Sequence, residues 1–210
     1  MKNGLTWDEI CAATDASVRR GGVAVDTVLP ITTDTRKVAA GDLFVALRGE
    51  NFDGTAFAAE ALERSAAAVL VDQKTPASVL AALDAAHGGV LVAEDTLRAY
   101  QDIAHAWRMK FNIPVVAITG SNGKTTTKDL TAAVLSGRGK VCRTAANYNN
   151  EVGLPLTLLS ITPEDTAAVV EIGMRGMGQI AALAPIAEPS IGIVTNVCEV
   201  HMELLGSIEN

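Results

Sequence analysis

Residues 119–126 combine the residue types that hold a phosphate group. They read Thr-Gly-Ser-Asn-Gly-Lys-Thr-Thr and directly follow the apolar run Val115–Ile118. The stretch after them, Thr125–Leu135, is expected to be a helix, with Leu130, Ala133 and Val134 on one apolar face. A strand, a glycine-bearing turn and a helix in this order are typical of a nucleotide-binding loop.

Each residue type in this loop has a chemical task. Gly120 and Gly123 allow backbone angles and a close approach that a Cβ would block. Backbone amides at the start of the helix can then point at anion oxygens. Lys124 would neutralise the β- and γ-phosphates, and the hydroxyl of Thr125 can ligate Mg²⁺. The sequence therefore predicts ATP and Mg²⁺ bound by Gly120, Ser121, Asn122, Gly123, Lys124, Thr125 and Thr126.

The loop departs from the general pattern G-x-x-x-x-G-K-[ST] at one position. That pattern requires glycine at 118, where this chain has Ile118. The alternative is a glycine-rich turn with a solvated lysine. The strand before the loop and the helix after it favour the nucleotide loop.

Two more predicted strands bring polar residues to the same edge of the sheet. Ala167–Glu171 ends in a carboxylate, and Ile191–Thr195 leads into Asn196, with His201 five residues later. The carboxyl ends of parallel strands face a common crevice, so Glu171 is a candidate second ligand for Mg²⁺. A solvated strand-end glutamate is equally compatible with the pattern. His201 alone is more typical of a structural or solvated histidine.

Apolar runs and alanine-rich helical stretches alternate along the whole chain and predict an α/β fold. We expect two domains, residues 1–95 and 96–210, with a parallel sheet in the second. The polar segment 147–151 precedes Gly153 and is compatible with a plain turn. The expected strands are 44–47, 68–71, 90–92, 115–118, 141–143, 167–172 and 191–195, and the expected helices are 56–64, 78–86, 96–110, 125–135 and 178–184.

Composition narrows the function further. The 210 residues carry a formal net charge of −7 and no cluster of Lys and Arg, which argues against a nucleic-acid partner. Three widely spaced cysteines lack metal-ligand or redox spacing. The N-terminal residues do not form a signal peptide, and no segment has the length of a membrane span. We therefore expect a cytoplasmic protein without membrane insertion.

Several motifs together resemble the Mur ligase family. The segment 118–127 resembles the nucleotide loop of that family, including the absence of glycine at 118. The segments 149–159 and 171–176 resemble the family member that adds D-alanyl-D-alanine, and Thr195-Asn196 with His201 resembles the family's T-N-x-x-x-x-H motif. In the first domain, segments 34–36, 41–49 and 52–54 look like the family's UDP-binding N-terminal domain. The resemblance covers about residues 31–210.

The resemblance implies a fold and a reaction. The fold would be a small UDP-binding α/β domain followed by part of a P-loop parallel-sheet ATPase domain. ATP would phosphorylate the terminal carboxylate of a UDP-N-acetylmuramoyl peptide, and the amine of D-alanyl-D-alanine would attack the acyl phosphate. Lys124 would hold the phosphates and Thr125 the first Mg²⁺. Residue by residue, the resemblance also places a second Mg²⁺ on Glu171 and His201 with Asn150 nearby, and the uridine diphosphate on Thr35 and Arg36.

The chain departs from the family pattern at several positions. Met177 and Gln179 replace a proline and a glutamate, and Thr55 stands where a histidine is frequent. The family also uses a third domain and a carbamylated lysine that would follow Asn210. We therefore expect a truncated chain without ligase turnover by itself, monomeric when full length. The alternatives are a family member that adds a single amino acid and a nucleotide-binding module without catalysis.

Overall fold

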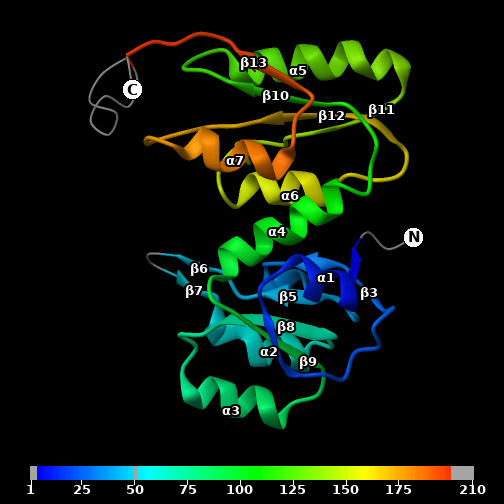
Figure 1. Cartoon of the computed structure of the whole chain (residues 1–210), viewed down its shortest axis with the longest axis vertical. Coiled ribbons are helices and arrows are strands. Elements are labelled where there is room, and N and C mark those ends of the chain that lie inside the picture. The colour runs from blue at the N-terminus through cyan, green and yellow to red at the C-terminus, as the bar shows by residue number, and fades with distance from the viewer. Residues whose placement is uncertain (1–3, 50–51, 200–210) are drawn as a thin grey trace. The chain divides into compact units, whose positions relative to one another are not determined.

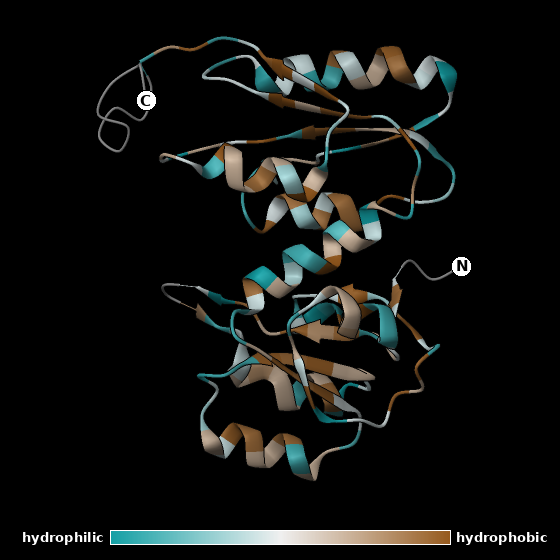
Figure 2. Ribbon diagram, viewed as in Figure 1, coloured by the Kyte–Doolittle hydropathy of each residue, from teal (hydrophilic) through white to brown (hydrophobic). Residues whose placement is uncertain are grey.

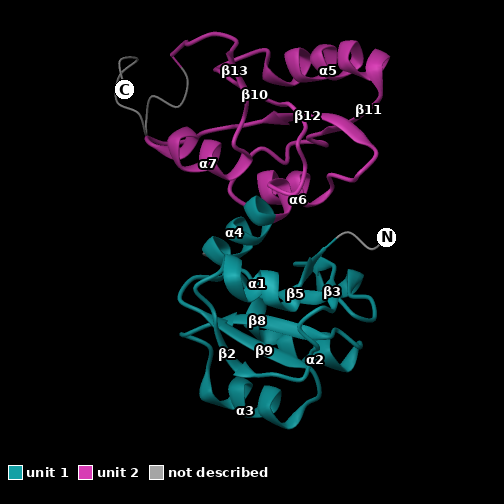
Figure 3. Ribbon diagram, turned by 45° about the vertical axis from the view of Figure 1, so that its right-hand side comes forward, with its two compact units in different colours: residues 1–106 teal, residues 107–210 magenta. Residues whose placement is uncertain are grey.

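The computed structural model describes residues 4–49 and 52–199. The chain forms two compact units, residues 1–106 and 107–210 (Figure 3). The division falls within helix α4 (Thr96–Arg108). The sequence placed the boundary near residue 95, at the start of this helix, whereas most of the helix is grouped with the first unit.

The first unit contains a five-stranded sheet with strand order β2-β9-β8-β5-β4. Strands β4, β5, β8 and β9 run parallel to one another, whereas β2 pairs with β9 in antiparallel orientation. Phe44, Val69 and Val90 from this sheet pack with Leu62 and Leu83 from its helices. The bounds are β2 Ser17–Arg20, β4 Ile31–Thr32, β5 Leu43–Val45, β8 Ala68–Asp72, β9 Gly89–Ala93, α2 Ala58–Glu63 and α3 Ala77–Ala85.

Short elements complete this unit. Helix α1 (Trp7–Ala13) begins with a capping box, in which Thr6 and Glu9 satisfy each other's backbone amides. Two small antiparallel pairs are β1–β3 and β6–β7. The sequence patterns did not predict α1 or the strands β1, β2, β3, β4, β6 and β7. The bounds are β1 Leu5–Thr6, β3 Val28–Leu29, β6 Arg48–Gly49, β7 Phe52–Asp53, and the 3₁₀ helices η1 Thr35–Lys37 and η2 Gly54–Phe57.

The second unit contains a parallel sheet with strand order β11-β12-β10-β13. Its two central strands are buried almost throughout, and Figure 2 shows them in the apolar colour. Helix α5 lies on one face of the sheet, and α6 and α7 lie on the other (Figure 1). The predicted α/β class with a parallel sheet is confirmed. The bounds are β10 Val115–Thr119, α5 Lys124–Leu135, η3 Ser136–Arg138, β11 Lys140–Arg143, α6 Gly153–Leu159, β12 Asp165–Glu171, α7 Gln179–Ala187 and β13 Ile191–Val194.

The orientation of α5 differs from the prediction. Leu130 and Val134, expected on its packing face, are 64% and 78% exposed. The buried face instead contains Lys128 and Ala132. Lys128 and Ala132 lie about one and two turns after Lys124. The side of α5 that carries Lys124 is therefore the side that packs against the sheet.

Residues 147–151 form a turn, as their pattern allows, whereas the helix that follows them was not predicted. Helix α6 begins at Gly153, and the side-chain oxygen of Asn150 accepts hydrogen bonds from the amides of Gly153 at 2.8 Å and Val152 at 3.3 Å. Pro155 lies in the first turn, where a missing N–H costs nothing. None of the described helices has the length and apolarity needed to cross a membrane.

Candidate functional site

The loop 120–123 connects β10 directly to α5, as the sequence predicted. Gly120 and Gly123 have φ angles of 128° and 81°, in the region that favours glycine. A Cβ at Gly120 would lie 2.2 Å from the hydroxyl of Thr195. The first glycine is therefore required both by the backbone conformation and by close packing against the segment that follows β13.

The N-terminus of α5 is open at this loop. Gly123 is its N-cap and has no side chain to satisfy the first amides, and the amide of Thr127 donates to the carbonyl of Gly123 at 2.9 Å. The amides of residues 124–126 therefore precede the first helical hydrogen bond. Free N–H groups and the positive end of the helix dipole make this a suitable seat for an anion.

Lys124 folds back over the loop. Its ammonium donates to the carbonyl oxygens of Gly120 at 2.6 Å and Ser121 at 3.2 Å. No carboxylate of the described residues lies within ion-pair distance of it. The charge of Lys124 is therefore held at the loop without being neutralised by a remote partner.

The segment after β13 fixes the shape of the loop. The amides of Ser121 and Asn122 donate to the backbone and side-chain oxygens of Asn196, at 3.0 Å and 2.9 Å. The hydroxyl of Thr195 donates to the carbonyl of Asn122 at 2.6 Å, and the amide of Cys198 donates to the hydroxyl of Ser121 at 2.8 Å. These two loop amides already have acceptors, whereas the amides of residues 124–126 precede the first hydrogen bond of α5 and remain available to a phosphate.

Glu171 ends β12 directly beside the loop. It pairs in register with Ile118 and is only 3% exposed, so the solvated alternative for Glu171 is wrong. One carboxylate oxygen accepts from the hydroxyl of Thr125 at 2.9 Å, and the other accepts from the side-chain amide of Asn149 at 2.8 Å. The amide of Glu171 donates to the hydroxyl of Thr144 at 3.0 Å. The carboxylate is thus fixed at the mouth of the phosphate loop.

The donor set around Glu171 suits Mg²⁺, which prefers oxygen ligands and is commonly held by one or two carboxylates together with substrate phosphates. The hydroxyl of Thr125 and the carboxylate of Glu171 are both oxygen donors, and they already lie in contact. His201, which the resemblance places with Glu171 on a second Mg²⁺, falls outside the described residues. Within the described ranges, no group of three or more His, Cys, Asp or Glu residues is arranged to hold a metal.

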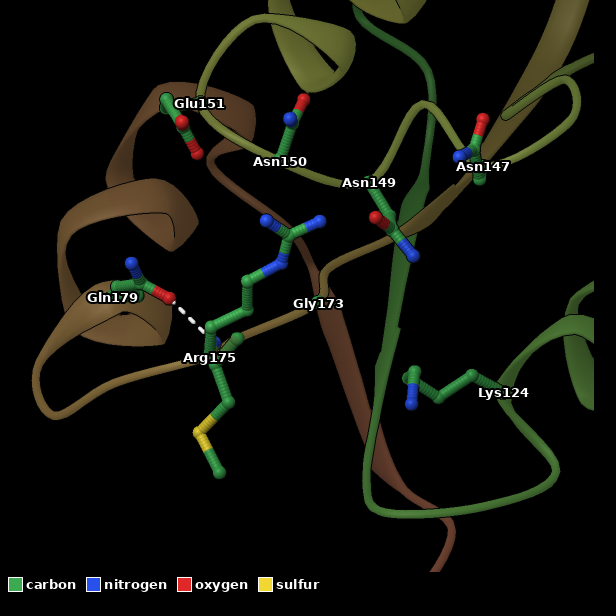
Figure 4. A pocket seen from close by; sticks show the side chains of 9 residues that line it. Lys124, Asn147, Asn149, Asn150, Glu151, Gly173, Arg175 and Gln179 are labelled. Carbon is green, nitrogen blue, oxygen red and sulfur yellow. Dashed lines mark hydrogen bonds between the residues drawn. The ribbon is translucent and has the colours of Figure 1, made fainter. Parts of the chain in front are cut away.

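A polar cavity of about 440 Å³ opens beside Lys124 (Figure 4). Three segments form its wall: the start of α5, the loop between β11 and α6, and the segment between β12 and α7. Asn150 lines this cavity, and its side-chain oxygen caps α6. The lining residues are Lys124, Asn147, Asn149, Asn150, Glu151, Gly173, Met174, Arg175 and Gln179.

Sequence reasoning missed Asn149 and Lys128. Asn149 contacts Glu171 across 22 positions of the chain, and no local pattern distinguishes it from its neighbour Asn150. Lys128 is 4% exposed, and its ammonium donates to the carbonyl of Thr144 at 3.0 Å. The only available signal for Lys128 was its spacing of one turn from Lys124.

Thr35 and Arg36, the predicted UDP contacts, lie in the first unit on η1. The guanidinium of Arg36 donates to both carboxylate oxygens of Asp34 at 2.9 Å, and its side chain is 85% exposed. These hydrogen bonds lower the pKa of Asp34 to about 2. The arginine is therefore held in one orientation at the surface of this unit.

A strand, a glycine-bearing turn and a helix with an open N-terminus, beside a buried carboxylate on the next strand, define an α/β protein of the phosphate-loop class. Within that class, the chain belongs to the Mur ligase family. Residues 28–108 match the family model described as Mur ligase family, catalytic domain, and residues 118–210 match the Mur ligase middle domain.

Individual relatives agree with this assignment. Over 177 residues the chain is 54% identical to the UDP-N-acetylmuramoyl-tripeptide–D-alanyl-D-alanine ligase of Synechocystis sp., covering 84% of this chain and 38% of that protein. The crystal structure of MurF from Acinetobacter baumannii superposes with a TM-score of 0.86 at 29% identity, over 97% of this chain and 43% of that one. MurF from Thermotoga maritima, in complex with ADP, gives a TM-score of 0.76 at 32% identity, over 86% and 40%.

Proposed function

We propose that the second unit binds Mg·ATP, with the phosphates on the amides of residues 124–126 and on Lys124. The observation that carries this proposal is the contact between Thr125 and Glu171 at the open end of α5. It brings two oxygen donors suited to Mg²⁺ to the place where the phosphates would end. The ADP complex of the Thermotoga maritima relative supports the nucleotide, and the metal is inferred from the donor atoms alone.

The whole protein would be an ATP-dependent amide ligase of peptidoglycan precursor synthesis. Its acyl substrate would be UDP-N-acetylmuramoyl-tripeptide and its amine D-alanyl-D-alanine, because these are the substrates in the names of its relatives. A carboxylate oxygen of the tripeptide would form a bond to the γ-phosphorus of ATP, and the bond to the β–γ bridging oxygen would break to release ADP. The amine would then attack the acyl carbon and displace phosphate, losing a proton as the amide forms.

This reaction requires cations, because a carboxylate must approach a triphosphate. Groups that stabilise the added charge in a site that excludes water lower the barrier most. In this chain Lys124 and the amides of α5 would hold the phosphates. A bound Mg²⁺ would act as a Lewis acid on the phosphoryl oxygens. Asn149 would keep the carboxylate of Glu171 aimed at that position.

The first unit would bind the uridine diphosphate part of the acyl substrate through Thr35 and Arg36. The orientation of Arg36 by Asp34 supports this assignment, since a planar guanidinium matches a phosphate well. The domain limits predicted from the sequence, 1–95 and 96–210, and a cytoplasmic location are part of the same proposal.

The test is a ligase assay on a protein that contains this chain and extends to the length of its relatives. We expect ADP release that depends on both UDP-N-acetylmuramoyl-tripeptide and D-alanyl-D-alanine. Turnover with a single diamino acid instead would identify the family member that adds a single amino acid. Nucleotide binding without ADP release, whichever amine is supplied, would favour a binding module over a ligase.

A further inference from the structure

Arg175 extends into the cavity beside the phosphate loop. It lies in the segment between β12 and α7, and Figure 4 shows its guanidinium directed between Asn149 and Asn150, with Lys124 at the other side of the cavity. No described residue accepts a hydrogen bond from this guanidinium. The cavity therefore holds a second positive charge that the phosphate site does not use.

The backbone of Arg175 is held in place by Gln179. The side-chain oxygen of Gln179 accepts from the amides of Arg175 at 2.6 Å and Gly176 at 3.2 Å. Gln179 is the first residue of α7, so the turn that carries Arg175 is anchored to a helix end. A neutral amide performs this task without placing a carboxylate next to the guanidinium.

The lining of the cavity suits an anion with a planar end. Lys124 and Arg175 provide two positive charges against one carboxylate, Glu151, among the described lining residues, and three asparagines add amide groups. An arginine fork pairs with a carboxylate through two parallel hydrogen bonds. The phosphates are already provided for by the amides of α5 and by Lys124 on the other side of the cavity.

We propose that Arg175 binds the reacting carboxylate of the acyl substrate and holds it opposite the phosphate seat of Lys124. This inference rests on the proposed ligase function and adds a substrate-binding residue to it. Arg175 neutralises the carboxylate, and Lys124 neutralises the phosphates that this carboxylate must approach. Gln179 is a positioning residue that fixes the turn from which the guanidinium reaches the carboxylate.

Calorimetry on a protein that contains this chain and extends to the length of its relatives tests this proposal with two matched probes. They are UDP-N-acetylmuramoyl-tripeptide and the same molecule with its reacting carboxylate converted to a primary amide, each titrated in the presence of Mg²⁺ and a non-hydrolysable ATP analogue. We expect the wild-type protein to bind the carboxylate form roughly tenfold more tightly, as a charge-assisted bidentate pair provides. Arg175→Ala should bind both forms alike, with its affinity for the ATP analogue unchanged.

Arg138→Ala is the matched control, because Arg138 is an exposed arginine in η3 of the same unit. It should retain the full preference for the carboxylate. A preference that survives in Arg175→Ala would overturn the inference, as would an equal loss of affinity for the ATP analogue, which would assign Arg175 to the phosphates. Failure of the extended wild-type protein to bind either nucleotide–peptide would contradict the proposed function itself.

Discussion

The hydroxyl of Thr125 donates a hydrogen bond to the carboxylate of Glu171 across 2.9 Å, joining the first turn of α5 to the last residue of β12. The two residues are separated by 46 positions in the chain. The parallel pairing of β10 with β12 brings them together, because it sets Ile118 beside Glu171. The site is therefore a consequence of strand order as much as of the loop motif.

Replacement of Glu171 by glutamine should separate metal binding from nucleotide binding. The amide retains the shape and one acceptor oxygen but removes the charge that favours Mg²⁺. We expect the Mg²⁺ concentration needed for half-maximal nucleotide binding to rise at least roughly tenfold, because mutation of groups that support a metal site typically weakens metal binding by roughly 10- to 100-fold. Binding of metal-free ATP should be equal or tighter, because a negative charge beside the phosphates is gone. Calorimetry with and without Mg²⁺ measures both, and an unchanged Mg²⁺ requirement would remove Glu171 from the metal site.

Alanine at three glycines should give three different losses of stability. Gly120→Ala combines a positive φ with a Cβ 2.2 Å from Thr195, and should lower the free energy of unfolding by about 2–4 kcal/mol. Gly123→Ala meets no atom within 4 Å and should lose only the backbone term, about 1–2 kcal/mol. Gly137→Ala, in open space without a positive φ, is the control. Urea unfolding gives the order, and equal losses at 120 and 137 would contradict the described loop conformation.

The three cysteines should react with a bulky maleimide in order of exposure. Cys198 is exposed and Cys11 partly so, whereas Cys142 is buried and its burial raises the pKa of its thiol. The backbone amide of Cys198 donates a hydrogen bond to the hydroxyl of Ser121. A bulky adduct on the Cys198 thiol should therefore distort the loop and weaken Mg·ATP binding. Mass spectrometry gives the order of labelling, and calorimetry gives the affinity. Cys198→Ser treated in the same way should keep its affinity; a loss in that variant too would show that another thiol is responsible.

The stability of the first unit should depend on the ionisation of Asp34. Its pKa is lowered from 3.8 to about 2 by hydrogen bonds from Arg36, so its contribution is complete above the unfolded pKa and is lost as the pH falls through the folded value. The difference in unfolding free energy between wild type and Asp34→Asn should therefore shrink between about pH 5 and pH 2. Asp26→Asn, at an exposed aspartate of the same unit, serves for comparison. A difference that stays constant over this range would show that Arg36 is not paired with Asp34 in solution.

Local signals were sufficient to predict the strand, loop and helix of residues 115–135 and the parallel sheet. The loop depends on consecutive residues, and the strands that carry it are continuous apolar runs such as Val115–Thr119. The site residues whose roles depend on distant contacts were harder to predict. Asn149 and Lys128 became visible only when strand order placed Glu171 and Thr144 beside them.

Two structural errors have the same cause. Helix α6 was not among the expected helices, because glycine and proline such as Gly153 and Pro155 are poor helix formers in isolation, yet here Asn150 caps the helix and Pro155 lies in its first turn. The packing face of α5 was assigned from its large apolar residues, whereas Lys124 and the sheet determine its rotation. In both cases, tertiary contacts overrode the local preference.

The most direct test of the proposed phosphate-binding site, the amides of residues 124–126 with Lys124, is Mg·ATP binding by the 210-residue chain. Calorimetry measures it for wild type and for Lys124→Ala. The ammonium lies on the loop carbonyls without an ion-pair partner among the described residues, so its loss should weaken binding at least roughly tenfold while leaving thermal stability nearly unchanged. Arg138→Ala should bind like wild type. Equal affinities of wild type and Lys124→Ala would contradict the assignment of this loop to the phosphates of ATP.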